Sequence, residues 1–134
     1  MKPLKLFCLS LSFILFSCSS KLTTVYFNDT SKVDDGDIFG EQLSSFFLPD
    51  KNIHVYKVES NVLNNELNKI KDSLKLLPSN TELDDAYYQY AFITSSKDTL
   101  FSQGLTYWKY NGKGKLYATL KIKSVLERTL KSKP

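Results

Sequence analysis

The segment from Asn61 to Leu77 carries the clearest hydrophobic pattern in the chain. Its apolar residues recur at steps of four and three, which places them along one side of an α-helix. They are Leu63, Leu67, Ile70, Leu74 and Leu77. Ser60 or Asn61 can cap the start by accepting a backbone N–H, and Pro78 prevents continuation. The pattern predicts an amphipathic helix that packs on an apolar surface.

Shorter apolar runs predict an antiparallel sheet. We expect strands at 22–27, 52–59, 86–95, 98–110 and 115–121. The run 86–95 is apolar on both faces, as in a strand covered on two sides, and Gly104 is expected to form a bulge. Short helices are expected at 40–48, ended by Pro49, and at 122–130. The fold class predicted is α+β, with about five strands, a C-terminal three-stranded meander and helices packed on the sheet.

Asn111-Gly112 predicts a hairpin between the last two strands, because both residues tolerate the positive φ of a tight primed turn. Turns of two or four residues give the same cross-strand faces. Leu105 and Tyr107 are then expected in the core. The opposite face is a candidate surface for a sugar ring or an acidic partner. Its members are Trp108, Tyr110, Lys115, Tyr117 and Lys121.

The same aromatic face can be explained without a ligand. Cross-strand aromatic pairs can stabilise a solvated sheet face, or a helix can cover them. Trp is large and usually at least partly buried, which favours this interpretation. The sequence alone leaves both interpretations open.

The first twenty residues have a different pattern from the rest. Lys2 and Lys5 precede an apolar stretch, 6–16, that is too short to span a bilayer comfortably and is followed by Ser17-Cys18. With Leu15 three residues before the cysteine and Ser17 directly before it, this segment resembles the signal of bacterial lipoproteins. Phe16 departs from the family pattern, in which this residue is usually small or β-branched, and this bears on the efficiency of cleavage.

The resemblance implies that the Cys18 thiol carries a diacylglycerol, that the chain is cut before it, and that acyl chains such as palmitate hold it to a membrane. Residues 1–17 are then a signal peptide, 18–21 a lipidated tether and 22–134 a single domain. Ser19, rather than Asp, follows the cysteine, which permits transfer to the outer membrane in lipoproteins of Gram-negative type. We expect a protein of the bacterial cell envelope, anchored on the periplasmic or surface face of the outer membrane.

Loss of the signal changes the charge and the thiol content. Removal of Lys2 and Lys5 lowers the formal net charge from +4 to +2, so nucleic acid is not an expected partner. Cys8 leaves with the signal and Cys18 is used for lipid, so no disulfide framework is expected. The C-terminal third stays basic, which suits anionic lipid headgroups, an acidic protein or ordinary solubility.

Catalytic and cofactor patterns are weak. His54 is the only histidine, which excludes a multi-histidine metal site, and no metal or cofactor is expected. The acidic loop 29–37 lacks the spacing of a helix-loop-helix calcium site and is better explained as a solvated loop. Glu82, Asp84 and Asp85 precede the strand expected at 86–95 and could in principle form an acid/base pair. Adjacent residues of an extended chain point to opposite faces, so Asp84 and Asp85 would not easily converge on one bond.

These observations predict a lipid-anchored, non-catalytic binding or accessory lipoprotein of the envelope. Its partner would be an envelope protein, an effector protein or a glycan. Two alternatives remain open. One is a protective immunity or inhibitor lipoprotein directed against a toxin or a lytic enzyme. The other is a small carboxylate-dependent hydrolase.

Overall fold

The computed structural model describes residues 20–32, 36–49, 52–76, 87–111, 113–116 and 120–131. The predicted signal, Cys18 and Tyr117 lie outside these residues. The helical elements are η2 (Thr30–Lys32), η3 (Gly40–Phe47), α2 (Asn61–Ser73) and α3 (Leu120–Lys131), of which η2 and η3 are 3₁₀ segments. The strands are β1 (Leu22–Asn28), β2 (Ile38–Phe39), β3 (Ile53–Glu59), β4 (Lys75–Leu76), β5 (Tyr87–Tyr88), β6 (Tyr90–Ile93), β7 (Thr99–Gln103), β8 (Tyr107–Tyr110) and β9 (Lys113–Leu116).

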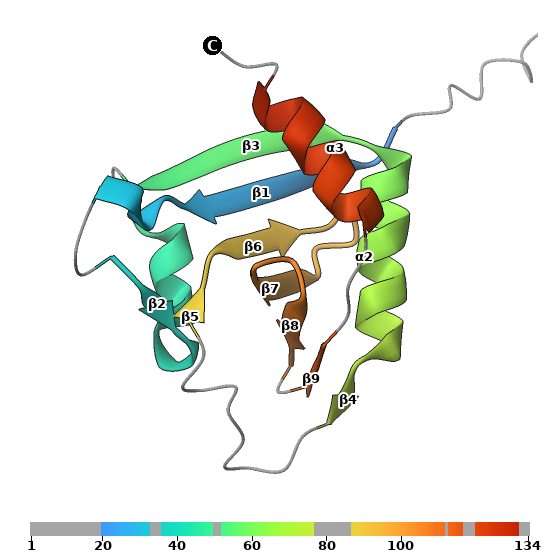
Figure 1. Ribbon diagram of the computed structural model, residues 1–134. Helices are drawn as coiled ribbons and strands as arrows, with labels where there is room; N and C mark the ends of the chain where they lie inside the picture. Colours follow the sequence, from blue (N-terminus) through green and yellow to red (C-terminus); the bar gives the residue numbers. More distant parts are fainter. Residues whose placement is uncertain are drawn as a thin grey trace, which may run out of the picture.

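The strands form a seven-stranded sheet in the order β3-β1-β6-β7-β8-β9-β4, and β2 pairs with β5 in a second, two-stranded sheet (Figure 1). All pairs are antiparallel. β1 pairs with β3 along its whole length, from Leu22 opposite Glu59 to Asn28 opposite Ile53. The α+β prediction is confirmed.

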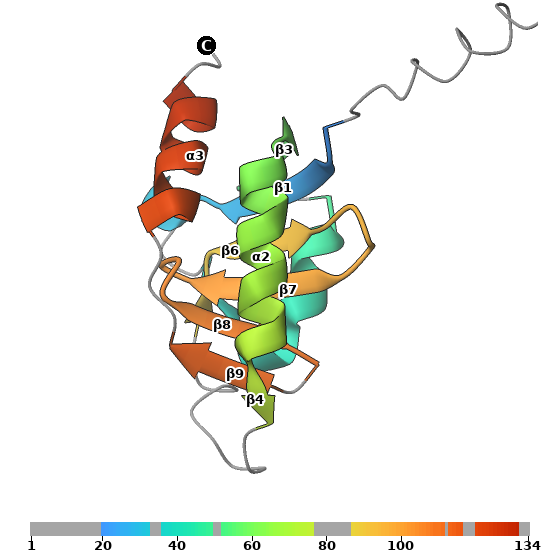
Figure 2. The same ribbon diagram turned by 90° about the vertical axis from the view of Figure 1, so that its right-hand side faces the viewer.

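The large sheet is covered on both faces. Side chains of α2 and α3 pack on one face, in a cluster of Leu63, Leu67, Ile70, Leu74, Ile122 and Leu126 with Val25, Val58, Phe92, Leu100 and Trp108. A smaller cluster forms on the other face, where Phe46 of η3 packs with Ile38, Tyr88 and Ala91. Figure 2 shows α2 running across the strands, with η3 behind them. The prediction that 86–95 is covered on two sides is therefore confirmed, since Phe92 and Ala91 enter different clusters.

Helix α2 begins as predicted and ends earlier. The Ser60 side chain accepts a hydrogen bond from the Leu63 N–H at 3.1 Å, so Ser60 is the N-cap. The helix ends at Ser73 rather than Leu77, and Leu74 is extended (φ −69°, ψ 143°). Lys75 and Leu76 then pair with β9, opposite Gly114 and Lys113. Pairing with a distant strand, which local periodicity does not encode, takes the place of the last helical turn.

The prediction of one long strand over 98–110 with a bulge at Gly104 is wrong. The chain reverses there, and Gln103 lies opposite Tyr107 in the β7–β8 hairpin. Gly104 and Leu105 both have left-handed backbone angles (φ 58° and 62°), and the Thr106 N–H donates to the Gln103 carbonyl at 3.2 Å. Two consecutive left-handed residues form a primed turn that suits the twist of a hairpin. The predicted meander therefore contains one strand more than expected.

The predicted hairpin at 111–112 has the expected register. Tyr110 lies opposite Lys113, and Trp108 lies opposite Lys115. Two residues therefore connect β8 to β9, as the Asn-Gly pair predicts. Asn111 has a φ of 49°, in the left-handed region that such a turn needs.

Candidate functional site

Trp108, the central residue of the aromatic face predicted on the β8–β9 hairpin, is not at the surface. Trp108 has an exposed fraction of 0%, and its ring centroid lies 5.4 Å from that of Phe92. It packs in the cluster beneath α2 and α3. Trp108 therefore cannot contact a ligand at the surface, and at this residue the structure agrees with the alternative, in which helices cover the face. The sequence pattern predicts the face of Leu105 and Tyr107 in the core. In the structure, Leu105 lies in the β7–β8 turn, and Tyr107 lies on the opposite side of β8 from the buried Trp108.

Tyr110 takes part in a hydrogen-bonded network within the domain. Its hydroxyl donates to Asp98 Oδ1 at 2.9 Å, and Lys71 Nζ lies 2.8 Å from Asp98 Oδ2. The hydrogen bond from Lys71, followed by that from Tyr110, holds the pKa of Asp98 below its usual value. The same bond to Asp98 raises the pKa of Lys71. These three groups join α2, the β6–β7 connection and β8.

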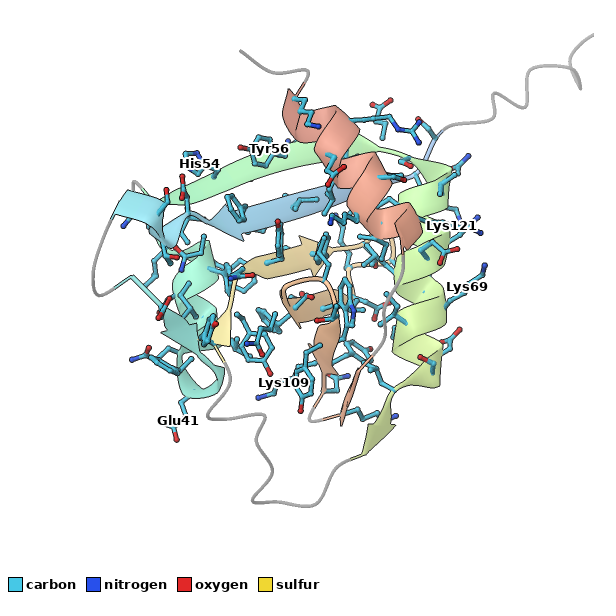
Figure 3. The ribbon with its side chains drawn as sticks, viewed as in Figure 1. Glu41, His54, Tyr56, Lys69, Lys109 and Lys121 are labelled. Atoms are coloured by element: carbon cyan, nitrogen blue, oxygen red, sulfur yellow. The ribbon has the colours of Figure 1, made fainter. Side chains whose placement is uncertain are left out.

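Of the remaining residues of the predicted face, only Lys121 has a side chain that the structure describes. Lys115 lies opposite Trp108 in the register, but its side chain is outside what the structure describes, as is the whole of Tyr117. Lys121 is exposed at the start of α3, and its Nζ is 3.7 Å from Glu66 Oε1. Figure 3 shows Lys121 and Lys69, which also pairs with Glu66, on the same side of the molecule. The hydrogen bond from Lys69 is the main reason why the pKa of the buried Glu66 is lowered.

An exposed apolar surface lies on the other face of the sheet, and we name it the η3–β3 patch. Leu48, Val55 and Phe47 are 61%, 52% and 43% exposed. They surround a hollow of about 220 Å³ whose remaining lining is Tyr26, Phe46, Pro49 and Ile53. The sequence pattern predicts Phe46 and Phe47 on one short helix, 40–48. Two adjacent residues of a helix point in directions about 100° apart, so one of two adjacent aromatic rings lies at the edge of the buried face, and this signal could have indicated an exposed ring.

A groove of about 520 Å³ separates α3 from the junction of β3 and α2. Three valines, two serines and three charged residues line it: Val58, Val62, Val125, Ser60, Ser124, Glu59, Lys121 and Arg128. Arg128 makes no ion pair with any residue that the structure describes. The only arginine in the sequence thus lies in the lining of a groove that combines valines with polar and charged side chains.

The acidic loop shows local rather than metal-binding contacts where it is described. Asp29 Oδ1 accepts hydrogen bonds from the backbone N–H and the hydroxyl of Ser31, at 3.1 and 2.6 Å. His54 Nε2 lies 3.9 Å from Asp29 Oδ2, and Figure 3 shows His54 and Tyr56 along β3 at the edge of the sheet. Among the described residues, no three His, Cys, Asp or Glu side chains form a group that could hold a metal ion.

The other predicted features lie outside the described residues, namely Asp34, Asp35, Glu82, Asp84, Asp85 and the lipidation residue Cys18. Within the described ranges, no helix is both long and apolar enough to cross a membrane. The chain matches no protein-family model, no curated protein and no solved structure. Its function must be inferred from its own chemistry and geometry.

Proposed function

We propose that the protein is a lipid-anchored, non-catalytic binding protein of the bacterial cell envelope, and that it contacts a protein partner through the η3–β3 patch. The observation that carries the binding role is the exposure of Phe47, Leu48 and Val55 around one hollow. Contiguous apolar side chains of this kind are expensive to leave in water and commonly mark interaction sites. The lining is apolar and favours a protein segment over a glycan.

The patch is also held in a fixed shape. The Phe47 ring meets Tyr26 edge-on, with centroids 5.1 Å apart, and lies 6.3 Å from Phe101. A ring already fixed by its neighbours loses little conformational entropy when a partner covers it. β3 is also the edge strand of the large sheet, so its backbone offers hydrogen-bonding groups beside the hollow.

The anchor rests on the lipoprotein-like signal. In the described chain, the first residues are fixed beside the start of α2, where the Lys21 N–H donates to Asn61 Oδ1 at 3.0 Å and the Ser60 N–H donates to the Lys21 carbonyl at 3.1 Å. A lipid attached at Cys18 would therefore hold the domain close to the bilayer. Each buried methylene contributes about 0.8 kcal/mol, so two or three acyl chains give stable attachment.

The partner is tested with a photo-reactive amino acid placed at Leu48 in the full-length precursor, expressed in its own cells. We expect one dominant adduct after irradiation, identified by mass spectrometry. The matched control is the same amino acid at Asn65, which is exposed on α2 on the other face of the sheet. A partner made by the cell itself supports the accessory role, whereas an incoming toxin or lytic enzyme supports the protective alternative. The absence of an adduct at both Leu48 and Val55 would contradict the patch.

The anchor is tested by Cys18→Ser in the same precursor. We expect loss of labelled fatty acid and release of the protein from the membrane fraction, with the domain still folded. Continued acylation or unchanged membrane retention of this variant would show that Cys18 is not the attachment point.

A further inference from the structure

The described chain begins beside the groove between α3 and the β3–α2 junction. Ser20 Oγ donates to Glu59 Oε2 at 3.1 Å, and Glu59 lines the groove. Cys18 precedes Ser20 by two residues, and each residue of extended chain spans at most about 3.6 Å. An acylated Cys18 is therefore confined to within about 7 Å of Ser20, which brings this side of the domain to the membrane surface.

The groove has the chemistry that a phospholipid headgroup needs. Arg128 and Lys121 can donate to phosphate oxygens, and a guanidinium can do so with two parallel N–H bonds. The Ser60 hydroxyl lines the groove and can add a further donor, whereas the Ser124 hydroxyl already donates to the Lys121 carbonyl at 3.0 Å. The walls between these polar groups are valines, which suit the glycerol and upper acyl region of a lipid.

Two exposed cations, Lys121 and Arg128, line the groove, against the single exposed carboxylate of Glu59. Lys123 and Glu127 are also exposed, but they line a second hollow on another side of α3. Lys123 Nζ lies 4.0 Å from Glu127 Oε1, so these two charges offset each other, whereas Arg128 has no ion-pair partner among the described residues. Figure 1 shows α3 crossing over the β3 and β1 side of the sheet, near the start of β1.

We propose that this groove and the exposed side of α3 dock on anionic phospholipid headgroups of the leaflet that holds the anchor. The inference rests on the proposed lipid anchor, which keeps the headgroups at a high effective concentration, so weak contacts suffice. Docking fixes the orientation of the domain. It also leaves the η3–β3 patch, on the opposite face of the sheet, open to its partner.

The test measures which side of the anchored protein meets the bilayer. The full-length precursor carrying Ser124→Cys is expressed and the acylated protein is reconstituted into vesicles of phosphatidylcholine, with or without about one third phosphatidylglycerol. An environment-sensitive dye is attached to the new thiol, and a nitroxide on the lipid headgroup serves as quencher. We expect strong quenching in the anionic vesicles, weaker quenching in neutral ones, and loss of the difference at high salt. The same dye at Ser44→Cys, on η3, should stay unquenched.

Charge variants provide the second measurement. Each basic contact with an anionic surface changes the ratio of docked to undocked protein by about fivefold. Lys121→Glu with Arg128→Glu should therefore abolish quenching at residue 124. Lys97→Glu with Lys113→Glu makes the same change of charge in the β6–β7 turn and at the start of β9, outside the lining of the groove, and should leave quenching unchanged. If the first pair fails to fold, Arg128→Glu alone should still reduce docking by at least fivefold.

The outcomes separate this inference from the proposed function. Protein that floats with the vesicles but shows no quenching at residue 124 overturns the docking and leaves the anchor intact. Equal quenching in neutral and anionic vesicles overturns the role of headgroup charge. A dye at residue 124 that responds only when envelope proteins are added assigns the groove to a protein and overturns the docking. Protein that carries no acyl group and does not float overturns the anchor itself.

Discussion

Asp98 connects parts of the chain that are distant in sequence. Its two carboxylate oxygens bond to Lys71 of α2 and Tyr110 of β8, and its backbone N–H donates to Thr94 Oγ1 at 3.2 Å. The Lys71 and Asp98 side chains are only 23% and 21% exposed, so their charges are partly removed from water. Losing one partner of such a pair costs more than losing an exposed ion pair, because the remaining charge stays partly buried.

We therefore predict that Asp98→Asn destabilises the protein by about 1–3 kcal/mol. The measurement is urea unfolding followed by the fluorescence of Trp108, the single and buried tryptophan. Asp37→Asn, a change of the same kind at an exposed position, should alter the free energy of unfolding by less than about 0.5 kcal/mol. Equal effects of the two substitutions would show that the contacts of Asp98 with Lys71 and Tyr110 do not stabilise the fold.

The same network predicts a pH dependence with a defined sign. The pKa of Asp98 in the folded protein is below its ordinary value of 3.8, because Lys71 and Tyr110 stabilise the carboxylate. Its ionisation thus contributes stability that is present above pH 3.8 and is lost as the pH falls through the lowered folded pKa. The difference in unfolding free energy between wild type and D98N should shrink across that window. A difference that stays constant down to pH 2 contradicts this assignment.

The sequence predicted which residues share a face of the sheet with Trp108, but not whether that face is buried. Strand alternation predicts that Trp108 shares a face with Tyr110 and with the residue opposite it, and the register agrees. Alternation does not say which face points to the core. That depends on the pairing of β8 with β7, in which Trp108 lies opposite the buried Ser102, and this pairing requires the β7–β8 turn that the sequence pattern did not predict.

At the scale of elements, local sequence signals predicted the start of helix α2 better than its end. Ser60 caps α2 because its side chain can reach the Leu63 N–H, a contact within one turn. The end of α2 depends on pairing of Lys75 and Leu76 with β9, some forty residues later. The turn at Gly104 was missed because its second left-handed residue, Leu105, is not a usual turn residue.

The turn between β6 and β7 offers a prediction about backbone strain. Lys97 is exposed and has a φ of 68°, and its N–H donates to the Thr94 carbonyl at 2.9 Å. A left-handed backbone costs a residue with a Cβ roughly 1 kcal/mol, and glycine avoids this cost. Lys97→Gly should therefore leave the protein as stable as wild type, or more stable by up to about 1 kcal/mol.

The neighbouring residue gives the matched control. Ser96 is exposed in the same turn, but it is not among the residues with positive φ. Ser96→Gly adds freedom to the unfolded chain and relieves nothing in the folded one, so it should destabilise. Thermal melting of both variants gives the comparison, and a melting temperature lowered equally by both would show that strain at Lys97 is negligible.

At the scale of the whole molecule, the two faces of the sheet differ in chemistry. The face under α2 and α3 carries the larger core and the cationic groove, and the other face carries η3 and the apolar patch. The doubly covered strand at 86–95 indicated from sequence that both faces are packed. It did not indicate the patch, because exposure of Phe47 and Leu48 depends on the kinked 3₁₀ geometry of η3.

This division predicts that the patch can be changed without loss of stability. Leu48 and Val55 are more than half exposed, so Leu48→Lys with Val55→Lys should change the free energy of unfolding by no more than about 0.5 kcal/mol per substitution. Phe46→Ala, in the same hollow but at a side chain with 0% exposure, should cost about 3–5 kcal/mol. The double-lysine variant should nevertheless lose the partner found by crosslinking, since two charges then face an apolar surface. Urea unfolding and capture of that partner are measured on the same preparations. If the lysines destabilise as much as Phe46→Ala does, the exposed residues serve the core and the patch is not a binding surface.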